Sequence, residues 1–144
     1  MKSSIHECRL IDLPKIHDVR GNLTFVEGSN LGEMEMKRIF WIYDVPGGEL
    51  RGGHAMHTMK EFIVALSGSF DVLLDDGTHK ATYTLNRSFY GLYVPSLIWR
   101  QMINFSTNSV ALVIASTPYD EADYILHYDE FISIKREKEL HDID

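Results

Sequence analysis

Short runs of apolar, β-branched and aromatic residues alternate along the chain with turn-forming residues, and no long helical pattern occurs before residue 118. Glycine, proline and aspartate punctuate the runs, as at Pro46-Gly47-Gly48 and Asp75-Asp76-Gly77. Many short strands at close, regular spacing are typical of a β-sandwich or barrel. The expected strands cover residues 5–13, 23–27, 37–45, 51–57, 61–66, 69–74, 79–85, 89–94, 98–105 and 110–116.

The pattern changes only after residue 118. Acidic residues favour one helical turn within 118–124 and another within 128–132, and the charged segment 135–144 is expected to fray. With 144 residues, the chain is expected to form one domain spanning 1–144. A chain of this size buries roughly 68–70% of its unfolded surface, so it needs no disulfide or structural metal to fold.

Charge and cysteine content narrow the function classes. The net charge of −7 argues against a general nucleic-acid binder, and an anionic small ligand would require locally placed arginines. Cys8 is the single cysteine, so no intramolecular disulfide is possible and we expect an inert thiol in a reducing compartment. No apolar leader and no run approaching 18 apolar residues is present, which predicts a cytoplasmic protein without a membrane span.

Residues 51–61 read Arg-Gly-Gly-His-Ala-Met-His-Thr-Met-Lys-Glu and run on to Gly68. The stretch resembles the first motif of the cupin family, in which a glycine precedes a His-x-His pair, a carboxylate and a second glycine. His54, Glu61 and Gly68 match, but the second histidine position is Met56. Side chains alternate across a strand, so Met56 should face the same side as His54, and His57 the other. The alternative is that His54 is a hydrogen-bonded core histidine.

Pro95, Arg100 and Asn104 stand at the spacing of the second cupin motif, with arginine at its histidine position. A guanidinium repels a divalent ion and cannot be deprotonated to bind one, so we predict neither a metal nor another cofactor. An inward-facing Arg100 would require an anion such as a phosphate. The alternative is a surface salt bridge.

A closer resemblance covers nearly the whole chain in order. It rests on Leu13-Pro14-Lys15-Ile16 with Asp18, Arg20-Gly21-Asn22-Leu23, Lys37-Arg38 ahead of Tyr43-Asp44-Val45-Pro46-Gly47-Gly48, Arg51-Gly52-Gly53-His54-Ala55, Leu74-Asp75-Asp76-Gly77, and Tyr119-Asp120-Glu121 through Tyr128-Asp129-Glu130-Phe131. In series these stretches resemble the WxcM-like sugar 3,4-ketoisomerases that act on dTDP-4-dehydro-6-deoxyglucose. The resemblance implies an all-β, metal-free cupin barrel with short C-terminal helical turns. It also implies a homodimer that binds a dTDP-linked sugar and makes deoxysugars for surface polysaccharide.

In that family the ketone moves from C4 to C3 through an enediol, and the motif is usually Arg-Gly-x-His-Ala-His-Lys with both histidines facing the sugar. Here the first histidine is His54, the second is Met56, and His57 replaces the lysine. Abstracting a proton next to a carbonyl requires a base, a group that stabilises the enolate oxygen, and a proton donor. Each positioned acid or base contributes roughly 10²–10⁴-fold in rate. If the second histidine normally supplies such a group, Met56 is expected to lower the activity by that factor.

We therefore assign hypothetical roles to the residues. His54 is the base, and Tyr43 donates a hydrogen bond or relays a proton, unless it is a core tyrosine. Arg51 and Arg100 hold pyrophosphate or sugar oxygens, and Glu61 orients His54.

Four further residues complete the expected site. Met56 and His57 are assigned to substrate binding because they occupy the second-histidine and lysine positions of the family motif. Arg38 lies on the opposite strand face from Tyr43 and is assigned to a contact across a dimer. Arg20 contacts either the ligand or the dimer interface. Trp41 and Trp99 are expected in the core.

Three other functions stay open at this point. A nucleotide-sugar epimerase would use a histidine base and a tyrosine acid on opposite faces of the ring. A non-catalytic nucleotide-sugar-binding cupin is favoured by Met56. A metal-dependent dioxygenase is the remaining class. The nucleotide and the galacto or gluco configuration of the product are also open.

Overall fold

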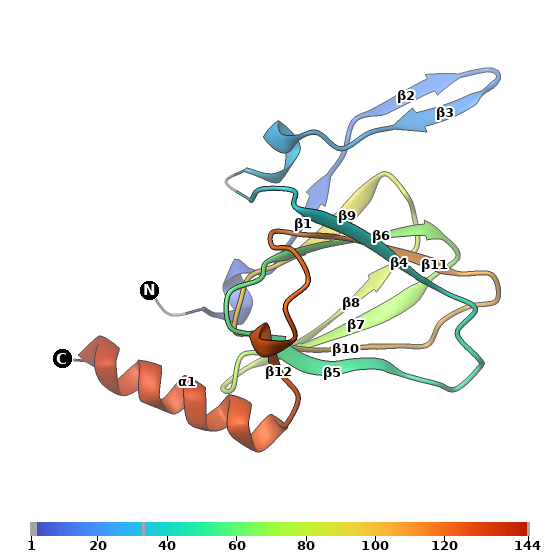
Figure 1. Ribbon diagram of the computed structural model, residues 1–144. Helices are drawn as coiled ribbons and strands as arrows, with labels where there is room; N and C mark the ends of the chain where they lie inside the picture. The colour runs from blue at the N-terminus through green and yellow to red at the C-terminus, as the bar shows by residue number, and fades with distance from the viewer. Residues whose placement is uncertain (1–2, 33, 144) are drawn as a thin grey trace.

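The computed structural model describes residues 3–32 and 34–143, and two five-stranded antiparallel sheets face each other in it (Figure 1). One sheet has the order β1 (Arg9–Asp12), β9 (Tyr90–Val94), β6 (Glu61–Ser67), β11 (Val110–Ala115) and β4 (Arg38–Tyr43). The other has the order β12 (Tyr124–Ile125), β5 (Arg51–Met56), β10 (Trp99–Ile103), β7 (Phe70–Asp75) and β8 (Lys80–Leu85). A separate hairpin pairs β2 (Lys15–Asp18) with β3 (Gly21–Thr24). This arrangement confirms the predicted all-β cupin class.

The main core fills the space between the two sheets. Inward side chains alternate with outward ones along β7 and β11, as the strand period of two requires. The core cluster includes Ile63, Phe70, Val72, Leu92 and Val113, and also Cys8. Burial raises the pKa of the Cys8 thiol to about 11, so the thiol stays protonated at neutral pH and inert, as predicted.

Gly68 forms the tight turn between β6 and β7 that the sequence motif predicts. Its φ of 68° is in the left-handed region that favours glycine. A Cβ atom at this position would lie 2.8 Å from the Ser109 Cα atom. Any side chain here would therefore push apart two neighbouring turns.

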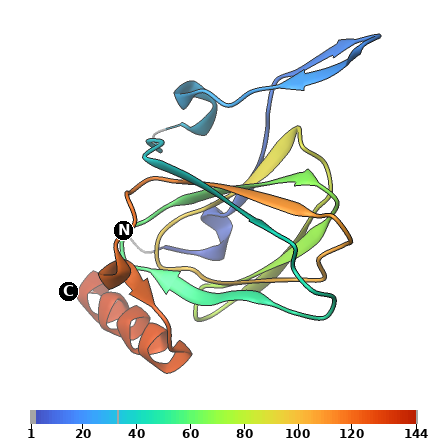
Figure 2. The ribbon, with the colours of Figure 1, turned by 45° about the vertical axis from the view of Figure 1, so that its right-hand side comes forward.

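The N-terminal segment differs from its prediction as one strand over 5–13. A short 3₁₀ turn, Ile5–Glu7, precedes β1, because the Ser4 side chain caps it and the Asp76 carboxylate accepts the Ile5 N–H at 2.8 Å. Lys15, which lies outside the predicted strands, begins β2. The β2–β3 hairpin projects from the two sheets in both views (Figures 1 and 2). A second 3₁₀ turn, Gly28–Leu31, lies between the predicted strands 23–27 and 37–45.

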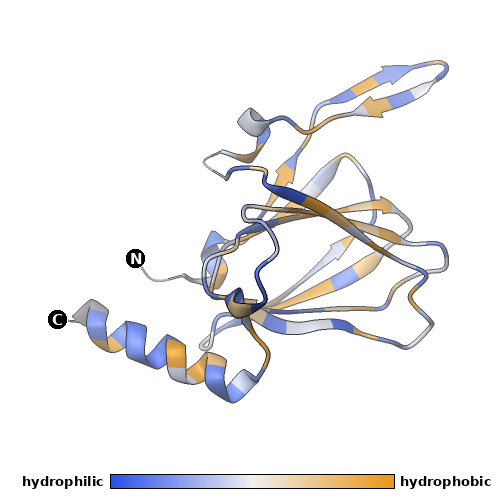
Figure 3. Ribbon diagram, viewed as in Figure 1, coloured by the Kyte–Doolittle hydropathy of each residue, from blue (hydrophilic) through white to orange (hydrophobic). Residues whose placement is uncertain are grey.

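The C-terminal segment was predicted wrongly as short turns followed by a fraying tail. Only the first turn is short, at Glu121–Asp123, and Tyr128–Ile143 forms one continuous helix, α1. Phe131 is fully buried against Ala55, Leu97 and Ile125. A few hydrophobic positions interrupt the otherwise polar helix (Figure 3). Packing on the sheet therefore stabilises a helix whose charged sequence favours solvent.

Candidate active site

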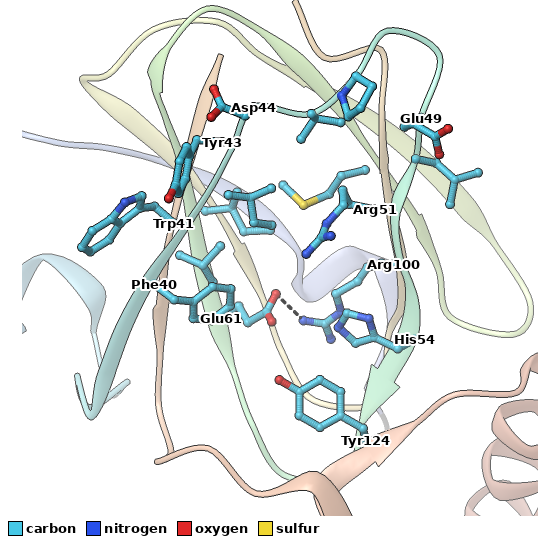
Figure 4. Close-up of a pocket in the computed structure, with 18 residues that line it drawn as sticks. Phe40, Trp41, Tyr43, Asp44, Glu49, Arg51, His54, Glu61, Arg100 and Tyr124 are labelled. Carbon is cyan, nitrogen blue, oxygen red and sulfur yellow. Dashed lines mark ion pairs between the residues drawn. The ribbon is translucent and has the colours of Figure 1, made fainter. Parts of the chain in front are cut away.

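A cavity of about 690 Å³ opens between the two sheets, with walls from β4, β5, β6, β10 and β11 (Figure 4). Its apolar lining includes Phe40, Ile63 and Val113. Its polar and charged lining comprises Tyr43, Asp44, Glu49, Arg51, His54, Glu61, Arg100 and Tyr124. A pocket with apolar walls and a few convergent charged groups is the usual form of a small-molecule site.

His54 lies on β5 directly opposite Arg100 on β10. Burial lowers the pKa of the His54 imidazole, and the positive charge of Arg100 lowers it further. The Glu61 carboxylate and a hydrogen bond to the Gly52 backbone partly offset this. The imidazole is therefore neutral near pH 7 and able to accept a proton.

Arg100 points into the molecule, where its partner is a protein carboxylate. Its Nη1 atom lies 2.7 Å from Glu61 Oε2, and both side chains are buried. This contact is an ion pair without hydrogen-bond geometry, so Nη1 has no hydrogen bond within the described residues. Nε and Nη2 donate to the Ile98 carbonyl at 3.2 and 3.0 Å, and Nη2 also to the Pro95 carbonyl at 3.3 Å. Most Arg100 donors are therefore engaged before any ligand binds.

Glu61 was predicted to orient His54. The structure pairs its carboxylate with Arg100, and Glu61 acts on His54 through charge. The two sequence motifs thus supply a buried Arg–Glu pair beside one histidine.

Glycines let β5 approach β10 closely next to His54. Gly52 has a φ of 99°, and a Cβ atom there would lie 3.0 Å from the Arg100 carbonyl oxygen. The strand register shifts at this point, between Arg100 and Gln101. Arg51, exposed just before the glycines, reaches the cavity wall.

Met56, the last residue of β5, and His57, which follows it, lie outside the cavity lining. Met56 is fully buried and packs with Met59, Ala115 and Tyr124. His57 is exposed, and its N–H donates to the Asp123 carbonyl at 2.9 Å. The strand alternation explains the position of His57, and neither residue is placed against a ligand in the cavity.

Alternation along β4 reverses two expectations. Tyr43 lies on the outer side of β4, where its side chain is 60% exposed, and it reaches only the rim of the cavity. Trp41 was expected in the core, but it lies on the same outer side and is 58% exposed. Arg38 lies on the opposite, inner face of β4, within hydrogen-bond reach of Met59. Its guanidinium lies 4.9 Å from the Phe40 ring centroid and 5.4 Å from that of Tyr119.

Two other predicted residues lie elsewhere. Arg20 is exposed at the turn of the β2–β3 hairpin, where its Nε lies 2.9 Å from Asp18 Oδ1. Trp99 is half-buried and packs edge-on against Tyr128 outside the cavity, with ring centroids 5.4 Å apart.

Tyr124 is the site residue that sequence reasoning missed. It lies in β12, a strand of two residues, and was assigned to a helical turn. Its ring centroid lies 5.3 Å from that of His54, and its hydroxyl end points into the cavity toward Glu61 (Figure 4). A strand this short has no alternation to detect, so only the register of β12 on β5 identifies Tyr124.

Among the residues that the structure describes, no three His, Cys, Asp or Glu side chains are grouped to hold a metal ion. Over the same residues, no helix has the length and apolar character needed to cross a bilayer.

The fold and the site define a cupin-type barrel with one histidine beside a buried Arg–Glu pair. Residues 6–136 match the family described as WxcM-like, C-terminal (FdtA), and the chain belongs to this family.

Relatives with known activities resemble this chain over most of its length. The TDP-4-oxo-6-deoxy-α-D-glucose-3,4-oxoisomerase of Aneurinibacillus thermoaerophilus is 41% identical over 125 residues, covering 87% of this chain and 90% of the relative. The sugar 3,4-ketoisomerase QdtA from Thermoanaerobacterium thermosaccharolyticum, solved with TDP, has a TM-score of 0.89 at 32% identity, covering 94% of this chain and 98% of that one. The TDP-quinovose 3,4-ketoisomerase WlaRB of Campylobacter jejuni has a TM-score of 0.85 at 39% identity, covering 90% of this chain and 99% of that one.

Proposed function

We propose that this protein is a metal-independent 3,4-ketoisomerase that converts a dTDP-4-dehydro-6-deoxyhexose to its 3-keto isomer through an enediol. The observation that carries the proposal is His54, a neutral histidine that lines the cavity between the sheets, in a chain 41% identical to a 3,4-oxoisomerase. A neutral imidazole in an apolar-walled site is suited to abstract the C3 proton of a 4-keto sugar.

The charge distribution supports an orientation for the substrate. His54 is partly buried where it lines the cavity, whereas Arg51 and Tyr43 line it and are exposed. The sugar therefore enters first and reaches His54. The pyrophosphate stays near the Arg51 guanidinium, which binds phosphate oxygens well. Arg100, engaged with Glu61, keeps the His54 imidazole neutral.

A homodimer is part of the proposal. The outer side of β4 exposes Ile39, Trp41 and Tyr43, and the projecting hairpin exposes Ile16 and Leu23, each at 53–60%. Apolar residues gathered on a projecting hairpin and a neighbouring strand are suited to self-association. We further propose that the enzyme acts in the cytoplasm, in the synthesis of deoxysugars for surface polysaccharide.

The proposal is tested by a proton NMR time course in D₂O with dTDP-4-dehydro-6-deoxyglucose, comparing the wild type with His54→Asn. We expect the wild type to form the 3-keto sugar with deuterium at C4. Loss of the base should slow His54→Asn by about 10²–10⁴-fold. Binding of TDP, measured by calorimetry, should stay within a few-fold in the variant.

Other results would identify the alternatives. Deuterium incorporation with inversion and no migration of the ketone would indicate an epimerase. TDP binding without turnover or exchange in the wild type would indicate a non-catalytic binding protein, a function consistent with Met56. Either result would refute the ketoisomerase proposal.

A further inference from the structure

We propose that Tyr124 is the second catalytic residue, which moves protons between the substrate oxygens while His54 moves the carbon-bound proton. The inference rests on the proposed ketoisomerase function and names a further residue of the same site. Its starting point is the ring of Tyr124, which lines the cavity 5.3 Å from the His54 ring centroid.

The strand register explains why Tyr124 is beside His54. Tyr124 pairs with Met56 across β12 and β5, and directly opposed residues project to the same side of an antiparallel pair. His54 lies two residues before Met56 and faces that same side. Because Met56 is fully buried beneath Tyr124, the phenol is the polar side chain that this strand pair adds next to the histidine.

Several contacts fix the backbone around Tyr124. The Asp123 carboxylate accepts the Thr58 N–H and hydroxyl, both at 2.8 Å, and the Met59 N–H at 3.0 Å. On the other side, Ile125 is fully buried with Phe131. A catalytic group on a rigid, doubly anchored segment is held in place before the substrate arrives.

The ketoisomerase reaction needs two proton movements, and the two side chains divide them. His54 takes the proton from C3 while the Tyr124 hydroxyl gives its proton to the C4 oxygen, which forms the enediol. The Tyr124 oxygen then takes the proton of the C3 hydroxyl as the C3 ketone forms, and the protonated His54, after exchange with solvent, delivers a proton to C4. Both residues end in their starting states, and no oxidant or other reactant is needed.

Tyr124→Phe tests this role because it removes only the hydroxyl. We expect kcat to fall by about 10²–10⁴-fold, the usual contribution of a positioned acid or base, with KM and TDP affinity within about threefold. Tyr119→Phe is the matched control. Tyr119 packs on Tyr124 with ring centroids 5.9 Å apart, but it is 64% exposed and does not line the cavity.

A second variant separates proton transfer from structural support. Tyr124→His keeps an ionisable ring at the same position, so it should be at least tenfold more active than Tyr124→Phe. A loss of less than tenfold in Tyr124→Phe, or a loss matched by Tyr119→Phe, would overturn this inference and leave the proposed function standing. So would equal activity of Tyr124→His and Tyr124→Phe while circular dichroism shows a folded protein. An inactive wild type would instead refute the underlying function.

Discussion

At the scale of single residues, an arginine at a cupin metal position changes what the site can do. Arg100 and Glu61 form a buried pair at 2.7 Å, and the positive charge lies opposite His54. Burying both charges of an ion pair costs desolvation free energy, so the pair contributes little net stability. The Arg100–Glu61 pair is therefore better explained by its effect on His54. Here the arginine disfavours the imidazolium form of His54 and thereby keeps a base available.

The pH dependence of catalysis follows from this arrangement. Burial and Arg100 lower the pKa of His54, so the acid limb of kcat/KM should lie below the ordinary histidine value of about 6.5. Activity is thus fully present above that limb and lost as the pH falls through it. The profile is measured from initial rates between pH 4.5 and 8. NMR titration of the His54 ring, assigned with His54→Asn, provides the control, and a limb at or above 6.5 would contradict the expectation.

At the scale of elements, helix α1 and strand β12 support the site from outside. Phe131 fills a cluster with Ala55 and Ile125, which are the neighbours of His54 and Tyr124 along their strands. The described residues of the helix do not line the cavity, yet the helix packs against both β12 and β5. A charged C-terminal segment therefore becomes part of the scaffold of the site.

Phe131→Ala should lower the free energy of unfolding by about 3–5 kcal/mol, since truncating a fully buried phenylalanine leaves a cavity. It should also speed amide hydrogen exchange at residues 124–125. Urea unfolding and exchange mass spectrometry measure the two effects. Leu140→Ala on the same helix, where the side chain is 66% exposed, should stay within about 0.5 kcal/mol of the wild type. Equal effects of the two changes would show that the helix does not support the sheet.

At the scale of the whole molecule, six of the fifteen large hydrophobic residues that are exposed among the described residues lie on β4 or on the projecting hairpin. Tyr43 belongs both to this surface and to the cavity rim. Association through this surface would therefore bring a second subunit close to the cavity mouth. Oligomeric state and substrate binding are expected to be coupled.

Trp41→Glu should convert the proposed homodimer to a monomer, because it places a charge in the centre of the apolar surface. Sedimentation velocity at micromolar concentration measures the change in mass. Leu140→Glu introduces the same charge on the exposed side of α1 and should leave the dimer intact. A wild type that sediments as a monomer would refute the homodimer.

The sequence by itself determined most of the strands, the turn at Gly68 and the places of His54 and Arg100 in the two motifs. These features depend on alternation and on spacing within a motif, which are local properties of the chain. Family resemblance then supplied the expected chemistry, although it directed attention to Tyr43 and His57 rather than to Tyr124.

Only the tertiary structure decided which side chains meet in the cavity. Tyr124 reaches His54 because β12 pairs with β5, and Arg38 turns inward because β4 places it on the same face as Phe40. The continuous helix α1 exists because the sheet buries Phe131. Each outcome depends on contacts between distant segments, whose register and packing free energy no local pattern contains.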